Sequence, residues 1–269
     1  MPAIQLARLK IQIIELLTYF DRPADFVREL HVLFGFYADR TRRPGQSGTP
    51  KPLIKAYNVP RQVMRRIKSD IALQVVSYPE SAFSLADQLW DDNWFECRLL
   101  AISILGLIPL ESNNRVIGRM QIWGKKCKED ALLDALLADG AVQIRDENPN
   151  EYLLLVEDWL SETEISSHKV GLRAVPALVM NSGFENLPAI YRLLAPLIRE
   201  STSVLEADML TAVRALGKRS PQETAYFLRQ NLTAPHKSGL AVITRRSLDV
   251  FPPDLQDSLR EVLREQMRR

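Results

Sequence analysis

Apolar residues recur at spacings of three and four along most of the chain, for example in IQLARLKIQIIELLTYF (4–20) and VPRQVMRRIKSDIALQVV (59–76). This spacing places apolar side chains on one face of an α-helix. The alternation of apolar and polar residues that indicates a strand is hard to find. Prolines stand near the starts of the periodic segments or just beyond them, as in first helical turns, at Pro60, Pro109, Pro188 and Pro221. The pattern therefore predicts an all-α protein.

Four helical segments share one pattern around a small residue: LLAISIL (99–105), LLADGAV (136–142), LRAVPAL (172–178) and LTAVRAL (210–216). Their alanines are 37, 36 and 38 residues apart, at Ala101, Ala138, Ala174 and Ala212. A further amphipathic segment precedes each one, so the repeated unit is a helix pair. Two-helix repeats of this length are typical of HEAT and armadillo-like proteins, whose neighbouring pairs stack to bury a shared core. We therefore expect a right-handed, curved α-solenoid of antiparallel helix pairs. Its concave face would be formed by the second helices, and the small alanines would let these helices approach closely.

Both ends of the chain differ from these repeats. AYFLRQNL and SGLAVITRRSL form a fifth, more divergent unit, and DLQDSLREVLREQMRR (254–269) is expected to cap the array. RTRRPGQSGTPKP (40–52) is rich in helix breakers and is expected to be a flexible loop. The sequence thus predicts an N-terminal helical pair at 1–39, a basic loop at 40–56 and a repeat solenoid at 57–269. One continuous domain that includes residues 1–39 is the alternative.

The composition is that of an ordinary globular protein, with 269 residues of which 46% are hydrophobic and 25% are charged. A chain of this length can bury a sizeable core. No run of 18 apolar residues occurs, and the charges at Arg8, Lys10 and Glu15 are unlike those of a signal peptide. We therefore expect a cytoplasmic protein without a membrane partner.

Several chemical classes find no support in the sequence. The only two cysteines, Cys97 and Cys127, match no metal-binding or redox spacing, and the three histidines have no ligand spacing between them. No Ser-His-Asp order, glycine-rich phosphate loop or HExxH segment occurs. We expect both cysteines to be reduced packing residues, and we expect neither a metal nor a cofactor.

Basic residues are unevenly distributed behind a net charge of +2. Between residues 40 and 69 there are nine of them and no acidic residue: Arg40, Arg42, Arg43, Lys51, Lys55, Arg61, Arg65, Arg66 and Lys68. Such a block forms either a surface that contacts phosphates or a solvated loop, and the block alone favours neither.

One stretch resembles a known family. LADQLWDDNWFECRLLAISILGLIP (85–109) is similar to the repeat that opens the core of AlkD-type DNA alkylation repair enzymes, in which a Glu-x-Arg-Leu-Leu-Ala helix follows a helix with a bulky last residue. Here the motif is Glu96, Arg98, Leu99, Leu100 and Ala101. MLTAVRALGKRSPQETAYFL (209–228) is similar to a later helix and loop of that family, and YNVPRQVMRRIKSDIA (57–72) to a helix start after its "GV-P" turn. The resemblance implies a HEAT-repeat solenoid that cradles double-stranded DNA.

The resemblance also implies an alkylpurine DNA glycosylase that needs no metal. In that family an aspartate stabilises the positive charge that grows on the sugar as the base leaves, and two tryptophans contact the lesion. In the repeat register the aspartate position is Asp134, four residues before Ala138. The tryptophan positions fall on Asp130 and on or near Thr211. Trp123 either replaces a lost aromatic group or belongs to the core.

The basic positions and the resemblance together predict contacts to the DNA backbone, which give salt-dependent and weakly sequence-specific binding. The expected DNA-binding residues are Arg61, Arg65, Arg66, Lys125, Lys126, Lys128, Arg173, Arg214, Lys218, Arg219, Arg245 and Arg246. Catalysis is left open, because Asp134 is present while both tryptophans are absent. The alternative function is a non-enzymatic repeat scaffold that binds a protein partner on the same concave face.

Overall fold

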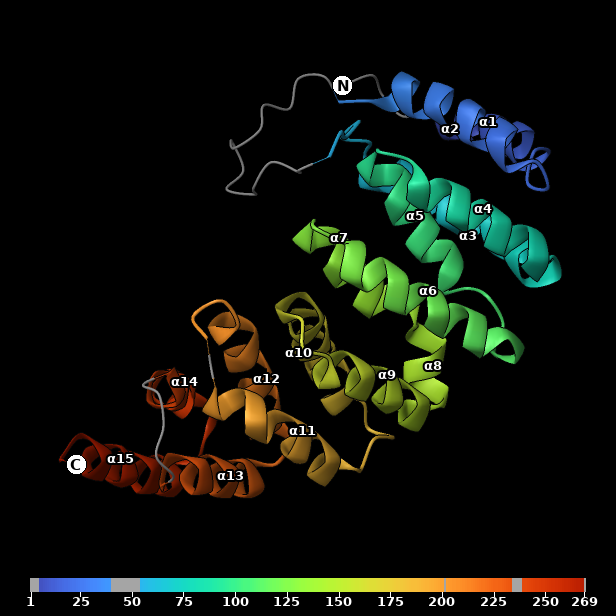
Figure 1. Cartoon of the computed structure of the whole chain (residues 1–269). Helices are drawn as coiled ribbons and strands as arrows, with labels where there is room; N and C mark the ends of the chain where they lie inside the picture. Colours follow the sequence, from blue (N-terminus) through green and yellow to red (C-terminus); the bar gives the residue numbers. More distant parts are fainter. Residues whose placement is uncertain (1–4, 40–53, 201, 234–238, 269) are drawn as a thin grey trace. The chain divides into compact units, whose positions relative to one another are not determined.

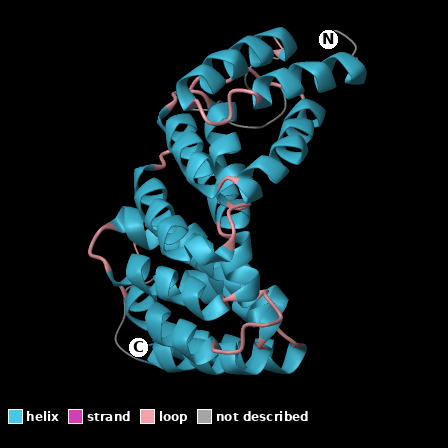
Figure 2. Cartoon of the chain, turned by 90° about the vertical axis from the view of Figure 1, so that its right-hand side faces the viewer, coloured by secondary structure: helices cyan, strands magenta, loops and turns pink. Residues whose placement is uncertain are grey.

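The structure is a computed structural model that describes residues 5–39, 54–200, 202–233 and 239–268 (Figure 1). Within these residues every regular element is a helix, and β-type pairing is limited to an isolated bridge between Lys55 and Trp94 (Figure 2). The all-α prediction is therefore confirmed. Most of the predicted basic loop, residues 40–53 with four of the nine clustered basic residues, lies outside the described part. No described helix combines the length and the apolar character needed to cross a bilayer.

Contacts between helices divide the chain into two compact units, Met1–Gln143 and Ile144–Arg269. Unit 1 contains α1 (Leu6–Leu17), α2 (Pro23–Tyr37), α3 (Arg61–Ser77), α4 (Pro79–Asp91), α5 (Phe95–Leu105), α6 (Asn113–Lys126), α7 (Asp130–Ala135) and the π-helix η2 (Leu136–Gly140). Unit 2 contains α9 (Pro149–Ser161), α10 (Ile165–Val179), α11 (Leu187–Arg199), α12 (Glu206–Arg219), α13 (Pro221–Thr233), α14 (Gly239–Ser247) and α15 (Pro253–Arg268). Shorter helical pieces are η1 (Leu110–Ser112), η3 (Leu248–Val250) and α8 (Val142–Glu147), which spans the boundary between the units.

Successive helices of unit 1 alternate between two layers. In one layer α1 contacts α3, α3 contacts α5, and α5 contacts α7 and η2. In the other layer α2 contacts α4, and α4 is joined to α6 by the ion pairs Arg115–Glu80 and Arg119–Asp87. Contacts between α4 and α5 connect the layers. Unit 1 is therefore built from stacked helix pairs, as the hydrophobic pattern predicts.

Unit 2 has the same alternation. One layer consists of α10, α12 and α14, and the other consists of α9, α11, α13 and α15, with each helix contacting the next in its layer. Each unit has one layer that we call its second-helix layer. In unit 1 this layer contains α3, α5 and α7, and in unit 2 it contains α10, α12 and α14.

Polar contacts within each unit repeat at close to the predicted period. Gln143 Nε2 donates to Gly106 O over 37 residues, Asn181 Nδ2 to Arg145 O over 36, and Arg219 Nη2 to Phe184 O over 35. Gly106 and Arg145 lie at the end of a helix, where backbone acceptors lack intrahelical partners, and Phe184 lies in the loop between α10 and α11. The helix pair is therefore the repeating unit of packing as well as of sequence.

One detail of the predicted register is wrong. Ala101, Ala174 and Ala212 are fully buried, whereas Ala138 is exposed. The cause is η2, since a π-helix bonds over five residues and shifts the faces that follow. The small buried residue is Gly140, where an added Cβ would lie 3.0 Å from a methyl of Leu136.

Gly106, at the end of α5, completes this close approach. A Cβ at Gly106 would lie 1.9 Å from the carbonyl oxygen of Asp139, which is an impossible contact with backbone. The close approach of α5 and η2 therefore depends on two glycines, Gly106 and Gly140, and not on Ala138.

Candidate functional site

Helix α3 carries an arginine stripe that begins at its first residue. Arg61, Arg65 and Lys68 are spaced by four and three residues and so share one face of the helix. Lys68 Nζ lies 3.9 Å from Asp139 Oδ2, which places this face toward η2. Burial lowers the pKa of the Lys68 ammonium, and the Asp139 carboxylate opposes that shift.

The two arginines of the stripe differ from their neighbours in having no compensating charge within the described part of the chain. Arg66 Nε donates to Asp70 Oδ2 at 2.7 Å, and Lys68 is paired with Asp139. Arg61 and Arg65 are exposed, and neither pairs with an acidic group among the described residues. We call Arg61 and Arg65 the α3 arginine pair. Two guanidinium groups one helical turn apart, open to water and uncompensated, are suited to bind phosphate oxygens.

A second basic group lies where α6 leads into α7. Lys125 and Lys126 end α6, and Lys128 stands in the turn before Asp130; all three lysines are exposed. In Figure 1 the start of α3 and the α6–α7 turn lie on the same side of unit 1. Sequence reasoning named both groups, and the structure brings them to one side of one unit.

Most of the arginines predicted to bind DNA in unit 2 are paired with acidic side chains. Arg173 Nε donates to Asp208 Oδ1 at 2.9 Å, and both side chains are less than one-fifth exposed. Arg214 binds both carboxylate oxygens of Asp249 at 2.6 Å, and this bonding lowers the pKa of the Asp249 carboxyl group. The third pair joins Arg246 to Glu206 at 2.8 Å. We call these three pairs, which link α10, α12 and the α14–η3 segment, the arginine ladder.

The remaining predicted contacts of unit 2 are mixed. Arg219 donates to Phe184 O, while Lys218 and Arg245 are exposed. Most arginine charge predicted to meet DNA in unit 2 is thus already compensated by acidic side chains.

Asp134, the predicted carboxylate, is exposed on α7, in the second-helix layer of unit 1. Asp130 is exposed one turn earlier, so α7 offers two carboxylates where the resemblance expects an aspartate and a tryptophan. Trp123 does not take the place of the missing aromatic group. It is 4% exposed and stacks on Trp90, with ring centroids 4.4 Å apart. Trp123 therefore belongs to the α4–α6 interface.

A cluster that sequence reasoning missed lies near the start of α5. His31 on α2, Asp92 in the α4–α5 turn and Cys97 on α5 place one possible metal-ligating atom each within 4.8 Å of one another. Burial raises the pKa of the Cys97 thiol, and the nearby Asp92 and Glu96 carboxylates raise it further. No sequence signal could have found this cluster, because His31 stands 61 residues before Asp92 in a helix outside the recognised repeats.

The segment before α3 is fastened beside this cluster. Glu96, which is 4% exposed, accepts hydrogen bonds from the backbone amides of Tyr57 and Val59. The Tyr57 ring stacks on Trp94 with centroids 3.9 Å apart. Asn58 has a φ of 56°, a left-handed conformation that asparagine tolerates better than most residues. The glutamate of the family-like motif is thus an anchor for the backbone that leads to the α3 arginine pair.

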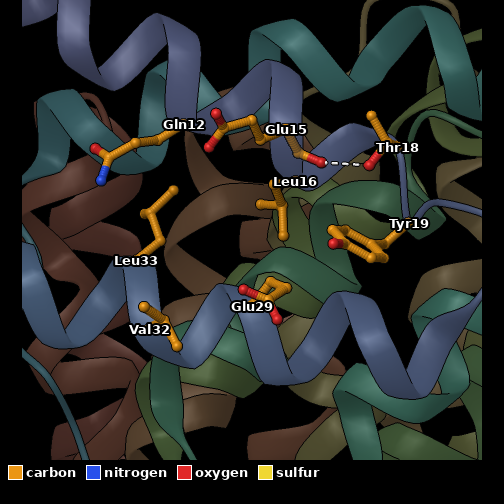
Figure 3. A pocket seen from close by; sticks show the side chains of 8 residues that line it. All are labelled: Gln12, Glu15, Leu16, Thr18, Tyr19, Glu29, Val32 and Leu33. Carbon is orange, nitrogen blue, oxygen red and sulfur yellow. Dashed lines mark hydrogen bonds between the residues drawn. The ribbon is translucent and has the colours of Figure 1, made fainter.

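A hollow of about 270 Å³ lies between α1 and α2 (Figure 3). Its lining includes the carboxylates of Glu15 and Glu29 and the apolar side chains of Leu16 and Leu33. Thr18 Oγ1 donates to Glu15 O at 2.7 Å at one end. An acidic lining repels phosphate, so this hollow is a poor candidate for a nucleic-acid contact.

Comparison with protein families gives one match. A family model described as DNA alkylation repair enzyme matches residues 38–247, which is most of the chain. Comparison with curated proteins and comparison with solved structures gave no significant match.

Proposed function

Because the chain belongs to the DNA alkylation repair enzyme family, we propose that it binds double-stranded DNA through the exposed cations of unit 1. The α3 arginine pair, together with Lys126 and Lys128, would contact backbone phosphates. Such contacts hold a duplex without reading its sequence, which suits a protein that must act wherever a base is alkylated.

The observation that carries this proposal is the uncompensated state of the α3 arginine pair. A guanidinium already bound to a carboxylate gains little from a phosphate, because it must first give up an equivalent partner. Arg61 and Arg65 have no such partner among the described residues, whereas Arg173, Arg214 and Arg246 have one each. The proposal therefore assigns phosphate binding to unit 1 and structural roles to the arginine ladder.

The first test is binding of the full chain to a fluorescently labelled duplex over a series of salt concentrations. We expect the affinity to fall steeply between low and physiological salt, since each phosphate contact releases condensed counterions. Absence of duplex binding at low salt would remove the proposal and favour a protein partner for the same surface.

A second candidate function, excision of an alkylated purine, is supported by the exposure of Asp134 on α7. A carboxylate beside the sugar would stabilise the oxocarbenium-like charge that forms as a cationic base departs. The missing tryptophans leave α7 without a π surface for the lesion, so we regard binding as the primary proposal and excision as separable from it.

Excision is tested on duplexes containing 7-methylguanine or 3-methyladenine. If Asp134 acts as proposed, Asp134→Asn lowers the rate of base release by about 100-fold, a typical loss for one electrostatic catalytic group, and leaves duplex affinity unchanged. Asp146→Asn, a change at another exposed carboxylate, is the matched control. Equal release by wild type and Asp134→Asn would exclude Asp134 as the catalytic group.

A further inference from the structure

Three side chains of unit 1 converge from three elements on one point. The ligating atoms of His31, Asp92 and Cys97 all lie within 4.8 Å of one another. The His31 and Asp92 side chains are 26% and 15% exposed, and Cys97 is fully buried. The cluster is therefore enclosed on most sides, and His31 is its most exposed member.

Hydrogen bonds within the cluster leave one strong acceptor weakly satisfied. Asp92 Oδ2 is 2.9 Å from His31 Nε2, whereas Asp92 Oδ1 is buried and receives no N–H or O–H donor, and the neighbouring Cys97 thiol is only a weak donor to this carboxylate. A buried polar atom without a partner is costly, and most such atoms in proteins are satisfied. A cation bound by this carboxylate would supply the missing interaction.

The surroundings of His31 suit an imidazole ligand. His31 Nδ1 is 3.0 Å from the Tyr57 hydroxyl oxygen. Without a metal, Nε2–H donates to Asp92 Oδ2 and Nδ1 accepts from the Tyr57 hydroxyl group. In the other neutral tautomer Nδ1–H donates to the Tyr57 oxygen, and the lone pair of Nε2 becomes available to a metal. Metal-bound histidines usually donate their other ring N–H to an outer partner in this manner. Tyr57 is itself held by stacking on Trp94 and by the bond from its amide to Glu96, so the outer partner is fixed.

We propose that His31 Nε2, a carboxylate oxygen of Asp92 and Cys97 Sγ bind a zinc ion, with a fourth position open to water. Zinc accepts nitrogen, oxygen and sulfur donors, and tetrahedral bonds of about 2.0 to 2.3 Å separate the ligand atoms by about 3.3 to 3.7 Å. The widest separation in the cluster is at most 4.8 Å. The most widely separated pair must therefore close by about 1 Å, and His31 Nε2 and Asp92 Oδ2, which are 2.9 Å apart, must separate by about 0.4 Å unless the metal takes Asp92 Oδ1. On binding, the Cys97 thiol loses its proton to solvent and the thiolate takes the metal.

A zinc ion at this point would join three parts of unit 1. It would tie α2 to the α4–α5 turn and to the first turn of α5. Through Tyr57 and Glu96 it would also brace the segment that leads into α3. The N-terminal helices would then be fastened to the repeats by coordination bonds, and this inference does not depend on DNA binding.

The test uses the full chain, kept reduced, stripped with a chelator and then supplied with zinc alone. We expect one zinc per chain after removal of free metal, and a melting temperature raised by about 5 °C or more when zinc exceeds its dissociation constant about 100-fold. Magnesium should give no shift, because it requires an oxygen cage.

Substitutions of the proposed ligands, compared with control substitutions, test which side chains bind zinc. Cys97→Ser and His31→Gln should lose stoichiometric zinc and the zinc-dependent shift. Cys127→Ser and His168→Gln, which change the other described cysteine and histidine, should keep both. Wild-type levels of zinc in Cys97→Ser would overturn the proposal, as would the absence of stoichiometric zinc in the wild type.

A spectroscopic measurement covers the case in which Cys97→Ser does not fold. Cobalt in place of zinc should give the near-ultraviolet charge-transfer absorption of a thiolate–cobalt bond, in the wild type and in Cys127→Ser alike. If neither protein shows this absorption, Cys97 is not a ligand. Melting temperatures that fall in the variants without any dependence on zinc would mean that the cluster is only a hydrogen-bonded brace.

Discussion

The two units differ in which contacts are most prominent between their second helices. In unit 1, α5 meets η2 through glycine, with Gly106 against the Asp139 carbonyl and Gly140 buried beside it. In unit 2, α10, α12 and the α14–η3 segment are linked by the arginine ladder. A glycine contact engages no charged side chain, whereas each ion pair of the arginine ladder engages one arginine and one acidic side chain. Arg61 and Arg65 on α3 therefore remain available for a partner, whereas Arg173 on α10 and Arg214 on α12 are engaged.

The ladder also follows from the repeat. Arg173 finds Asp208 and Arg214 finds Asp249, each 35 residues later. Residues one period apart on stacked helices are neighbours, so an arginine and an acid separated by a period can pair. A count of basic residues in the sequence cannot distinguish such an arginine from one that faces solvent.

The largest expected effect comes from the glycine contact of unit 1. Gly106→Ala should destabilise the protein by about 3 kcal/mol, because its Cβ would overlap a backbone oxygen that no rotamer change can move. Chemical denaturation would measure this loss.

The matched control is Gly118→Ala, inside α6, where an added Cβ meets nothing within 4 Å. This change should stabilise the protein by about 1 kcal/mol through helix propensity. A Gly106→Ala protein as stable as the wild type would mean that unit 1 is not held by this close approach.

A smaller effect is expected from the enclosed pair of the ladder. Asp208→Asn removes the carboxylate charge that Asp208 offers to the enclosed Arg173, which is 19% exposed, and should cost about 2 kcal/mol. Asp249→Asn should cost less than about 1 kcal/mol, since the Asp249 side chain is 64% exposed and solvent screens its pair. The free energy of unfolding of both variants, measured in low and in high salt, would compare the two losses. Losses of equal size would contradict the distinction between enclosed and exposed pairs.

Much of the fold could be predicted from periodicity. The helices, the period near 36 residues and the prolines at helix starts all follow from local rules, as Pro221 at the start of α13 illustrates. The π-helix η2 could not be predicted, because LLADGAV has the same apolar pattern as its counterparts. Its register depends on the contact between Gly106 and the Asp139 carbonyl, which is a tertiary constraint.

The candidate site also has features that the sequence predicts and features that it does not. Arg61 and Arg65 could be named from the sequence because a basic block is visible there. That neither pairs with an acidic group in the part of the chain that the structure describes could not be predicted. The cluster of His31, Asp92 and Cys97 was invisible, because its members come from separate elements and share no spacing. Glu96 was noticed as part of a motif, yet its role as an anchor for Tyr57 and Val59 appears only in three dimensions.

The central claim is that the α3 arginine pair binds DNA and the arginine ladder does not. The most direct measurement is the slope of log affinity against log salt for a duplex, in two variants that each lose two positive charges. Arg61→Gln/Arg65→Gln should lower the magnitude of the slope by about 2, because each lost phosphate contact removes about one unit. Arg214→Gln/Arg246→Gln, which removes two cations paired with acids, should leave the slope close to that of the wild type. Equal slopes in the two variants, or an unchanged slope in Arg61→Gln/Arg65→Gln, would contradict the claim.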